Sequence, residues 1–300
     1  MSAKSRALLI LTYHRVLSAV DPLRRGEITQ AALARHAVVL RRWFNVLPLS
    51  QAWRRTLEGS LPARAVAITF DDGYADNAEL ALPILKRQGL TATFFVATGF
   101  LDGGRMWNDT IIESLRHAPP PLDLRDLDGG MLASDDVTAR AEAVERVIGA
   151  WKRLPPAERQ RRVDALVARA HANPPDDLMM RSNQVRELAR AGMEVGAHTV
   201  THPILRSISD DQAAAEMSES RSSLEALTGT RVGAFAYPNG RLGDDYDARH
   251  AEIARRVGFD LAVSTNGGSA RAESDPYQLP RFAPWAESNW KFAARLLRAY

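Results

Sequence analysis

The 300-residue chain has an ordinary globular composition, with 45% hydrophobic and 25% charged residues. Its formal net charge is only +3, and no dense basic block with interleaved aromatic residues occurs, so nucleic acid is not an expected partner. The absence of cysteine excludes disulfides and thiolate ligands, so any bound metal would take nitrogen and oxygen ligands.

The N-terminal region predicts a buried strand. The apolar run Ala7–Leu11 is too short for a signal peptide, and Tyr13-His14-Arg15 follows it without a clean small-residue cleavage site. No apolar run is long enough to span a bilayer. We therefore expect a cytoplasmic location without a transmembrane segment, and association with the cell envelope is the alternative.

Strands and helices alternate along the first third of the chain. The pattern predicts a strand at 7–12, a helix at 29–42 capped by Thr29, a strand at 44–49, a helix at 50–57 capped by Ser50, a strand at 65–70, a helix at 75–88 closed by Gly89, and a strand at 91–97. Short links between such elements are typical of parallel α/β architecture.

The alternation stops at about 102–178. This segment contains Pro119-Pro120-Pro121, which breaks regular structure, and a charged helical stretch at 134–171. We expect a helical insertion without a core of its own, serving as a lid or flank, within a single catalytic domain that spans 1–300.

The alternation resumes after the insertion. It predicts helices at 183–191, 209–227, 247–257 and 288–299, strands at 193–197, 232–237 and 261–264, and an edge segment at 279–282. Roughly seven strand–helix repeats, with polar residues after many strands, favour a closed or nearly closed parallel barrel over an open sheet. No Gly-rich phosphate loop follows any strand, so a nucleotide-dependent enzyme is not expected.

Two motifs carry the chemistry. Asp71-Asp72-Gly73 and His198-Thr199-Val200-Thr201-His202-Pro203 each follow a predicted strand. Together they offer one carboxylate and two imidazoles to a divalent metal and leave a second carboxylate beside it, which is the inventory of a metal-assisted hydrolase. Each motif alone has an ordinary explanation, since an Asp pair before glycine is common in turns and His-x-x-x-His occurs by chance.

In this order, Thr69-Phe70-Asp71-Asp72-Gly73 and the His motif resemble the first two motifs of the polysaccharide deacetylase family, carbohydrate esterase family 4 or NodB-homology domain. The segments Thr12–Val16 and Leu279–Phe282 resemble the branch that deacetylates poly-N-acetylglucosamine and related exopolysaccharides. The resemblance runs from Thr12 to Phe282 and is weakest in the insertion. It implies an α/β fold, a distorted (β/α)7-type barrel, with one divalent ion in an open groove. Zn²⁺ is the first expectation, and Co²⁺, Ni²⁺ and Mn²⁺ are alternatives.

The resemblance implies roles for the two motifs. Asp72, His198 and His202 are the expected metal ligands, and Asp71 is the expected general base. The alternative exchanges the two carboxylates, with Asp71 as ligand and Asp72 as turn former. Many members also have a late Leu-x-His motif, but no histidine follows His250, which we place on the surface of a charged helix.

The general acid expected from the resemblance is His14, which can donate a proton near neutral pH. A purely structural histidine is the alternative. The common third motif has Arg where Ala236 stands, so Asp71 lacks its usual partner. We hypothesise that Arg281 replaces it and keeps the pKa of Asp71 low; an exposed salt bridge of Arg281 is the alternative.

Phe235-Ala236-Tyr237-Pro238-Asn239-Gly240 resembles that third motif. The backbone N–H of Asn239 can stabilise the oxyanion, and Tyr237 and Pro238 are expected to bind substrate. Trp107 is a candidate platform for a sugar ring, with core or lid packing as an equal alternative. We assign no role to His36, His117 or His171.

We therefore expect a hydrolase of non-peptide carbon–nitrogen bonds in linear amides. It would remove acetyl groups from N-acetylglucosamine-type units of a polysaccharide or oligosaccharide, so its partner would be an N-acetylated glycan. One alternative is the same chemistry on a small amide or cyclic imide, which a deep closed pocket would favour. The other is a carbohydrate-binding homologue with impaired turnover.

Overall fold

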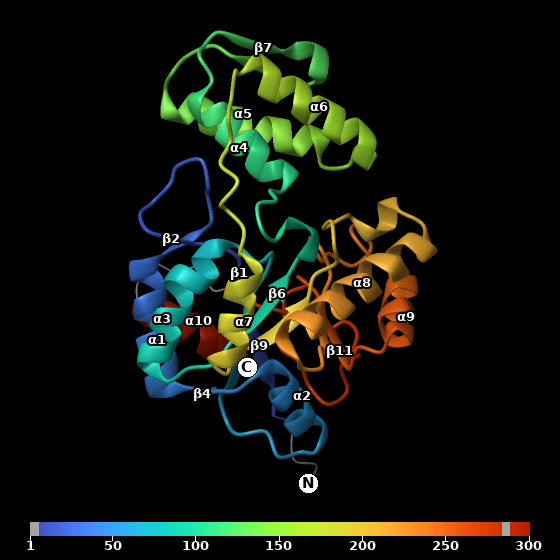
Figure 1. The fold of residues 1–300 in the computed structure, drawn as a ribbon. Helices are drawn as coiled ribbons and strands as arrows, with labels where there is room; N and C mark the ends of the chain where they lie inside the picture. The colour runs from blue at the N-terminus through green and yellow to red at the C-terminus, as the bar shows by residue number, and fades with distance from the viewer. Residues whose placement is uncertain (1–5, 284–288) are drawn as a thin grey trace. The chain divides into compact units, whose positions relative to one another are not determined.

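The computed structural model describes residues 6–283 and 289–300, and its chain forms two compact units (Figure 1). The sheet unit comprises Met1–Ala19, Glu27–Asp102 and Met179–Tyr300, and the helical unit comprises Val20–Gly26 and Gly103–Leu178. Within the described residues, no helix combines the length and apolarity that crossing a membrane requires.

A parallel seven-stranded sheet organises the sheet unit. Its order is β1-β5-β6-β9-β10-β11, and β4 also pairs with β5. The strands are β1 (Leu8–Tyr13), β4 (Asn45–Val46), β5 (Ala65–Phe70), β6 (Thr93–Val96), β9 (Glu194–Ala197), β10 (Ala234–Ala236) and β11 (Leu261–Val263). Because every pair is parallel, the carboxyl ends of the strands meet at one edge.

The segment Leu279–Phe282, called the closing segment below, joins the two outer strands of this sheet. Leu279 bridges Val263 of β11, and Phe282 bridges Leu11 of β1. The Phe282 N–H donates to the Ile10 carbonyl at 2.7 Å. The curled sheet is thereby completed, which confirms the expectation of a distorted parallel α/β barrel.

The remaining elements of the sheet unit surround this sheet. They are β2 (Val16–Leu17), β3 (Ile28–Thr29), α1 (Gln30–Trp43), α2 (Leu49–Leu57), the π-turn η1 (Asn77–Ala81), α3 (Leu82–Gln88), the 3₁₀ turn η2 (Thr98–Phe100), α7 (Ser182–Arg190), the 3₁₀ turn η4 (Leu205–Ser207), α8 (Asp210–Thr228), α9 (Ala248–Val257) and α10 (Asn289–Arg298).

Local signals set several of these boundaries. The Thr29 side chain accepts the Ala32 N–H at the start of α1, and Gly89 ends α3 in the left-handed region at φ 61°. The prediction that Ser50 caps a helix was wrong. Helix α2 begins at Leu49, and the Ser50 backbone and hydroxyl both donate to the Glu194 carboxylate instead.

Successive residues of each strand face opposite sides of the sheet, so the buried apolar side chains form two layers. Leu9 and Leu11 of β1 pack with the surrounding helices, whereas Leu8 and Ile10 share a second cluster with side chains of β5, β6, β10 and β11. The second cluster contains Phe95, and a Cβ on its neighbour Gly196 would come within 2.4 Å of the Phe95 ring. Glycine at this position of β9 therefore makes room for a large ring.

The helical unit contains α4 (Trp107–His117), β7 (Leu122–Leu124), the 3₁₀ turn η3 (Arg125–Leu127), β8 (Gly130–Leu132), α5 (Val137–Trp151) and α6 (Pro156–Arg169). It has its own buried cluster: Leu23, Ile111, Ile112, Leu115, Ala118, Leu122, Leu124, Leu132, Ala141, Ala143, Val144, Val147, Trp151, Val163, Leu166 and Ala170. The helical unit covers the insertion predicted at about 102–178, but the expectation that this insertion has no core of its own was wrong, because its charged helices each bury an apolar stripe.

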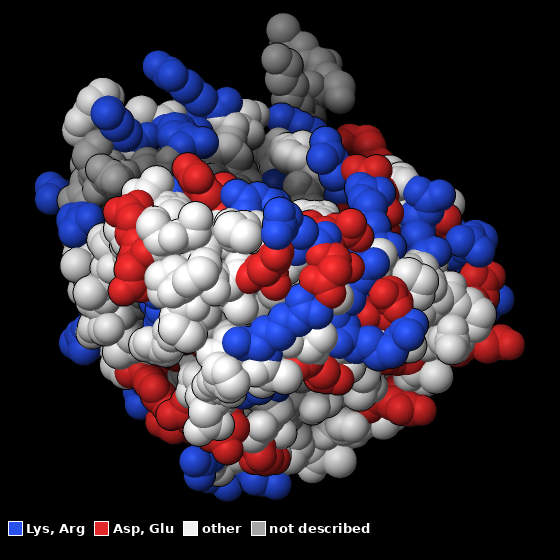
Figure 2. Space-filling model, turned by 90° about the horizontal axis from the view of Figure 1, so that it is seen from above, with Lys and Arg blue, Asp and Glu red and all other residues white. Residues whose placement is uncertain are grey.

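Surface charges are mostly arranged as mixed pairs. The face drawn in Figure 2 shows basic and acidic side chains interspersed. In the helical unit, Glu158 accepts from both Arg161 and Arg162 on α6, and Arg169 pairs with Asp126. Such exposed pairs add little stability individually, but they prevent this surface from having an electrostatic potential of a single sign.

Candidate active site

Residues from distant parts of the chain meet at the carboxyl edge of the sheet. His14 follows β1, Asp71 and Asp72 follow β5, and His198 follows β9. Arg281 belongs to the closing segment between β11 and β1. The carboxyl edge of a parallel sheet is the usual position of functional residues in α/β folds.

Asp72, His198 and His202 form a compact cluster. The Oδ1 atom of Asp72 lies 3.3 Å from the Nε2 atom of each imidazole, and one donor atom from each residue lies within 4.8 Å of the others. The side chains are largely buried, with 10% of Asp72, 2% of His198 and 15% of His202 exposed. The structure thus brings together the three residues that the sequence proposed as ligands.

The chemistry of this cluster fits a divalent cation. Within the described part of the chain, the buried Oδ1 atom of Asp72 has no hydrogen-bond partner. The Nδ1 atom of His198 lies 2.7 Å from the Ala236 carbonyl, which can only accept, so Nδ1 carries the proton and Nε2 presents a lone pair. Two nitrogens and one oxygen are a suitable donor set for a catalytic Zn²⁺ and leave a position open.

The ionisation of the cluster favours metal binding as well. Burial alone would raise the pKa of Asp72, but the His198 and His202 rings lower that pKa well below its usual value. Burial lowers the pKa of His202 and outweighs the opposite effect of Asp72. At neutral pH the carboxylate is therefore charged and the His202 ring neutral, which are the forms that bind metal.

The backbone around the cluster is held in unusual conformations. Asp72, Thr199 and His202 lie in the left-handed region at φ 75°, 65° and 53°. Gly73 follows at φ 87°, and a Cβ on it would approach the Val96 Cγ1 atom to 3.0 Å. Only glycine satisfies both the backbone and the space at this position.

The loop that carries both histidines is braced by Glu216 of α8. The Glu216 carboxylate accepts the N–H groups of Val200 at 2.7 Å and Thr201 at 2.8 Å, and the Thr201 hydroxyl at 2.6 Å. Sequence reasoning missed Glu216, because an isolated acid within an amphipathic helix carries no recognisable signal.

A second brace comes from the turn after β6. Thr98 N–H donates to the Thr199 carbonyl at 3.1 Å, and Gly99 N–H donates to the Val200 carbonyl at 2.8 Å. A Cβ on Gly99 would lie 2.7 Å from that same Val200 oxygen. Gly99 was also missed; its requirement comes from the close approach of two backbones and not from any motif.

Asp71 is paired with Arg281 rather than with the histidine cluster. The Nη1 and Nη2 atoms of Arg281 donate to the two carboxylate oxygens of Asp71 at 2.7 and 2.6 Å, and Arg281 Nε donates to the Ser264 carbonyl at 2.9 Å. Burial by itself would raise the pKa of Asp71, but the Arg281 charge and hydrogen bonds hold it below its usual value. The structure contains the Asp71–Arg281 pairing that the sequence predicted. The alternative, in which Arg281 forms an exposed salt bridge, is wrong because Arg281 is buried.

His14 lies at the same edge with part of its side chain open to solvent. Its Nε2 atom is 4.0 Å from Oδ2 of Asp71, and 38% of the side chain is exposed. Asn77 fixes the local backbone by donating to the His14 carbonyl at 2.8 Å. Partial burial would lower the pKa of His14, but the charges of Asp72 and Asp71 raise it above its ordinary value.

The third motif needs a correction. Tyr237 is buried, its ring stacks on Tyr246 at 3.8 Å, and its hydroxyl donates to the Tyr277 carbonyl at 2.9 Å. Pro238 is buried too. Their assignment as substrate-binding side chains was therefore wrong, since apolar spacing placed them in a strand end but did not show which way they face. Asn239 is half-buried, with φ 61°, in the turn after β10.

Other predicted residues take structural positions. Trp107 begins α4 of the helical unit, packs against its core and lies 4.8 Å beneath the Arg159 guanidinium, so its sugar-stacking role stays a prediction. His250 is buried rather than on the surface, because its Nδ1 completes the capping box with Asp247 at the start of α9. His36 is buried as well and stacks on Phe292 at 3.8 Å.

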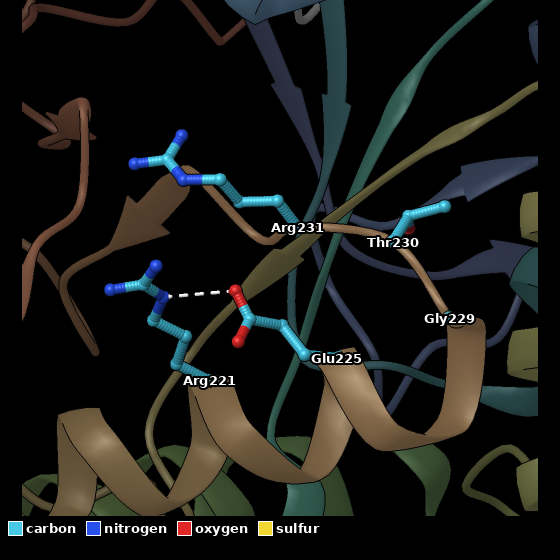
Figure 3. Close-up of a pocket in the computed structure, with 5 residues that line it drawn as sticks. All are labelled: Arg221, Glu225, Gly229, Thr230 and Arg231. Atoms are coloured by element: carbon cyan, nitrogen blue, oxygen red, sulfur yellow. Dashed lines mark hydrogen bonds and ion pairs between the residues drawn. The ribbon is translucent and has the colours of Figure 1, made fainter.

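A separate surface hollow lies at the end of α8 (Figure 3). Its guanidinium groups are engaged with the protein: Arg221 donates to Glu225 at 3.1 Å and to the Val257 carbonyl at 2.6 Å, and Arg231 donates to the Gly258 carbonyl at 3.1 Å. These bonds satisfy carbonyls at the end of α9, so the hollow is explained by helix termination.

The fold and the site define a class: an α/β barrel with a candidate metal cluster of one aspartate and two histidines, and a buried Asp–Arg pair, at its carboxyl edge. Residues 58–123 and 135–262 match the family description "Polysaccharide deacetylase". This is more than half of the chain, so the chain belongs to the polysaccharide deacetylase family, as the motif resemblance predicted.

Individual relatives are distant. The chain is 22% identical over 218 residues to YxkH of Bacillus subtilis (strain 168), and the match covers 73% of the chain and 50% of YxkH. The chain thus spans about half the length of this curated relative.

Three solved structures share the fold. The deacetylase PplD of Streptococcus pyogenes, in complex with acetate, has a TM-score of 0.66 at 21% identity and 99% coverage of both chains. IcaB from Ammonifex degensii has a TM-score of 0.63 at 21% identity and 97% coverage of both chains. A de-N-acetylase from Aggregatibacter actinomycetemcomitans has a TM-score of 0.62 at 16% identity, with 97% of this chain and 99% of that chain covered.

Proposed function

We propose that this protein is a metal-dependent N-deacetylase that hydrolyses the acetamide of N-acetylglucosamine-type units in a polysaccharide or oligosaccharide. The observation that carries the proposal is that two adjacent carboxylates have different partners. Asp72 contacts the imidazoles of His198 and His202, whereas Asp71 accepts two hydrogen bonds from Arg281. Family membership supports a deacetylase, and the metal and the glycan are the proposed parts.

Asp72, His198 and His202 would hold the ion. A divalent cation in such a site lowers the pKa of a bound water toward neutrality and polarises the carbonyl to be attacked. The Ala236 carbonyl keeps His198 in the tautomer that presents Nε2, and Glu216 keeps the loop of both histidines in place.

Asp71 would act as the general base by taking a proton from the attacking water. Arg281 keeps this carboxylate ionised and oriented, and each carboxylate oxygen retains a lone pair for the proton. His14 would protonate the leaving nitrogen, so the C–N bond breaks to give acetate and a free amine. The backbone N–H of Asn239 would stabilise the negative charge that develops on the carbonyl oxygen.

The pairing of Asp71 with Arg281 favours an active enzyme over a carbohydrate-binding homologue. Ala236 occupies the position where the common third motif has arginine, which by itself would suggest a lost catalytic partner. Arg281 instead reaches Asp71 from the closing segment at hydrogen-bonding distance. The charge that the motif lacks is thus supplied from another element.

The test is acetate release by purified protein, stripped of metal and then reloaded with Zn²⁺ or Co²⁺, on N-acetylglucosamine oligomers. We expect turnover that depends on the added ion. A panel of small linear amides and cyclic imides should give much lower kcat/KM. Turnover confined to the small amides, or binding of oligomers without acetate release, would contradict the proposal.

A further inference from the structure

Helices α1 and α10 lie side by side in the sheet unit (Figure 1). His36 of α1 stacks on Phe292 of α10 at 3.8 Å, and Phe44, just after α1, stacks on Tyr300 at 6.4 Å. Eight positions separate the contacts on each chain segment, so the helices run in the same direction. The exposed residues of these two neighbouring helices, including Trp43 and Trp290, are called the helix-pair surface below.

The charged side chains of the helix-pair surface are all basic. Neither helix contains an acidic residue, and together they contain six cations, all exposed: Arg35, Arg41, Arg42, Lys291, Arg295 and Arg298. Among the described residues, no carboxylate forms an ion pair with Arg41, Arg42, Lys291 or Arg298. This differs from the paired charges of α6 and α9, where acidic and basic residues alternate.

The same surface exposes large apolar side chains. The exposed fraction is 51% for Trp43, 70% for Trp290, 48% for Val38 and 55% for Leu297. Two of these are tryptophans, the side chain that prefers the boundary between water and lipid headgroups. Both tryptophans have a cation above the ring, Arg42 at 5.4 Å and Lys291 at 5.8 Å.

We propose that the helix-pair surface docks this protein peripherally on an anionic lipid bilayer. The four cations Arg41, Arg42, Lys291 and Arg298 are complementary to anionic headgroups, and the exposed tryptophan and leucine side chains of the same helices can enter the interfacial layer. A protein partner of ordinary surface composition would bring basic as well as acidic side chains against Arg41, Arg42, Lys291 and Arg298, which makes it a poorer match. The inference rests on surface chemistry and does not depend on the proposed catalytic function.

The experiment is co-sedimentation of the full chain with vesicles of phosphatidylglycerol and phosphatidylcholine, compared with vesicles of phosphatidylcholine alone. We expect binding to the anionic vesicles that weakens steeply with added salt, since surface charge is screened. The variant Arg41→Glu/Arg298→Glu should lower the partition constant by at least about tenfold, because each cation near such a surface contributes about fivefold. Trp43→Ser/Trp290→Ser should lower it and abolish any blue shift of tryptophan emission.

Matched variants distinguish this surface from general effects. Arg186→Glu/Arg190→Glu makes the same charge change on exposed positions of α7, and Leu57→Ser/Leu242→Ser removes exposed apolar side chains elsewhere. Both controls should bind vesicles more tightly than the corresponding test variants. Equal loss in test and control pairs, no binding of the unmodified chain at low salt, or a change of oligomeric mass in place of vesicle binding would overturn the proposal.

Discussion

At the scale of single residues, the neighbouring carboxylates of Asp71 and Asp72 lie in different surroundings. Asp72 faces imidazole nitrogens, and Asp71 faces a guanidinium. Adjacent strand residues point to opposite sides, and the left-handed backbone of Asp72 extends that divergence past the strand end. One dipeptide can therefore supply two separate functions.

The first prediction separates these functions. Asp71→Asn should retain metal but lower kcat by about 10²- to 10⁴-fold, because the amide cannot accept the proton. His202→Ala should instead lose metal, because one of three ligands is gone. Metal content by mass spectrometry and acetate release would be measured together. Near-full activity of Asp71→Asn would show that the base is another group.

The second prediction concerns Arg281. It lowers the pKa of Asp71, and Asp71 must be ionised to act as base, so removing Arg281 should raise that pKa. The acidic limb of the kcat/KM–pH profile of Arg281→Met should then move to higher pH. This variant should also be destabilised by about 3–5 kcal/mol, because the buried Asp71 charge loses its partner.

Arg281→Lys is the companion variant. It keeps the charge but not the two-pronged geometry, so its acidic limb should lie between those of the unmodified protein and Arg281→Met. An unchanged acidic limb in both variants would mean that Asp71 does not control the profile.

At the scale of elements, the site depends on a loop that is held in place by neighbouring elements. The histidine loop after β9 is held by Glu216 of α8 and by the backbone after β6. Motif reasoning located the histidines themselves, because their motif follows the Asp71-Asp72-Gly73 motif in the order that the family resemblance predicts. It could not locate Glu216 or Gly99, whose importance comes from contacts between elements far apart in sequence.

The third prediction tests the Glu216 brace. Glu216→Ala frees two N–H groups and one hydroxyl of the loop, so metal affinity should fall about 10- to 100-fold, the usual cost of losing an outer support. Glu219→Ala, an exposed acid on the same helix, should leave affinity unchanged. Competition with a fluorescent chelator measures both. Equal affinities would show that the loop is positioned without Glu216.

Strand and helix boundaries were predictable where strong local signals exist. The strand at Ala65–Phe70 has the predicted bounds, and α1 and α8 begin directly after their N-cap residues Thr29 and Ser209. The predicted strand at 44–49 contracts to Asn45–Val46, because pairing with β5 involves only those positions. The π-turn at Asn77–Ala81 has no signature in hydrophobic spacing, which is why a regular helix was predicted there.

At the scale of the whole molecule, the parallel barrel was predictable and the second core was not. Repeated strand–helix units with short links specify the sheet, whereas the helical unit draws its core from short apolar stripes between charged residues. It also takes in Val20–Gly26, where Arg24 donates to Asp109 at 2.6 Å and to Glu113 at 2.8 Å. An ion pair across more than 80 positions leaves no local trace in the sequence.

The fourth prediction uses the charges of the helical unit. Burial alone would raise the pKa values of Asp21 and Glu113, but hydrogen bonds from Arg116 lower both below their usual values. Their contribution to stability is therefore present above the unfolded pKa of about 4 and is lost as pH falls through the lower folded values. Arg116→Met should lower the free energy of unfolding by ~1 kcal/mol at pH 7, discounted for partial exposure.

The measurement is urea unfolding at pH 7 and at acidic pH, with circular dichroism as the signal. The deficit of Arg116→Met relative to the unmodified chain should shrink on acidification. Arg125→Met, which breaks an exposed pair with Asp123, is the matched control and should have no measurable effect. A deficit of Arg116→Met that is independent of pH would exclude the ionic explanation.

The position of the closing segment in the chain affects the order in which the site is assembled during synthesis. Ribosomes make Leu279–Phe282 after both loops that bear Asp72 and the two histidines. A nascent chain can therefore bring the proposed metal ligands together before Asp71, the proposed base, is paired with Arg281. On the proposed mechanism, hydrolysis would begin only after this segment has docked, and a chain cleaved just before Leu279 would lose turnover but keep the three proposed metal ligands.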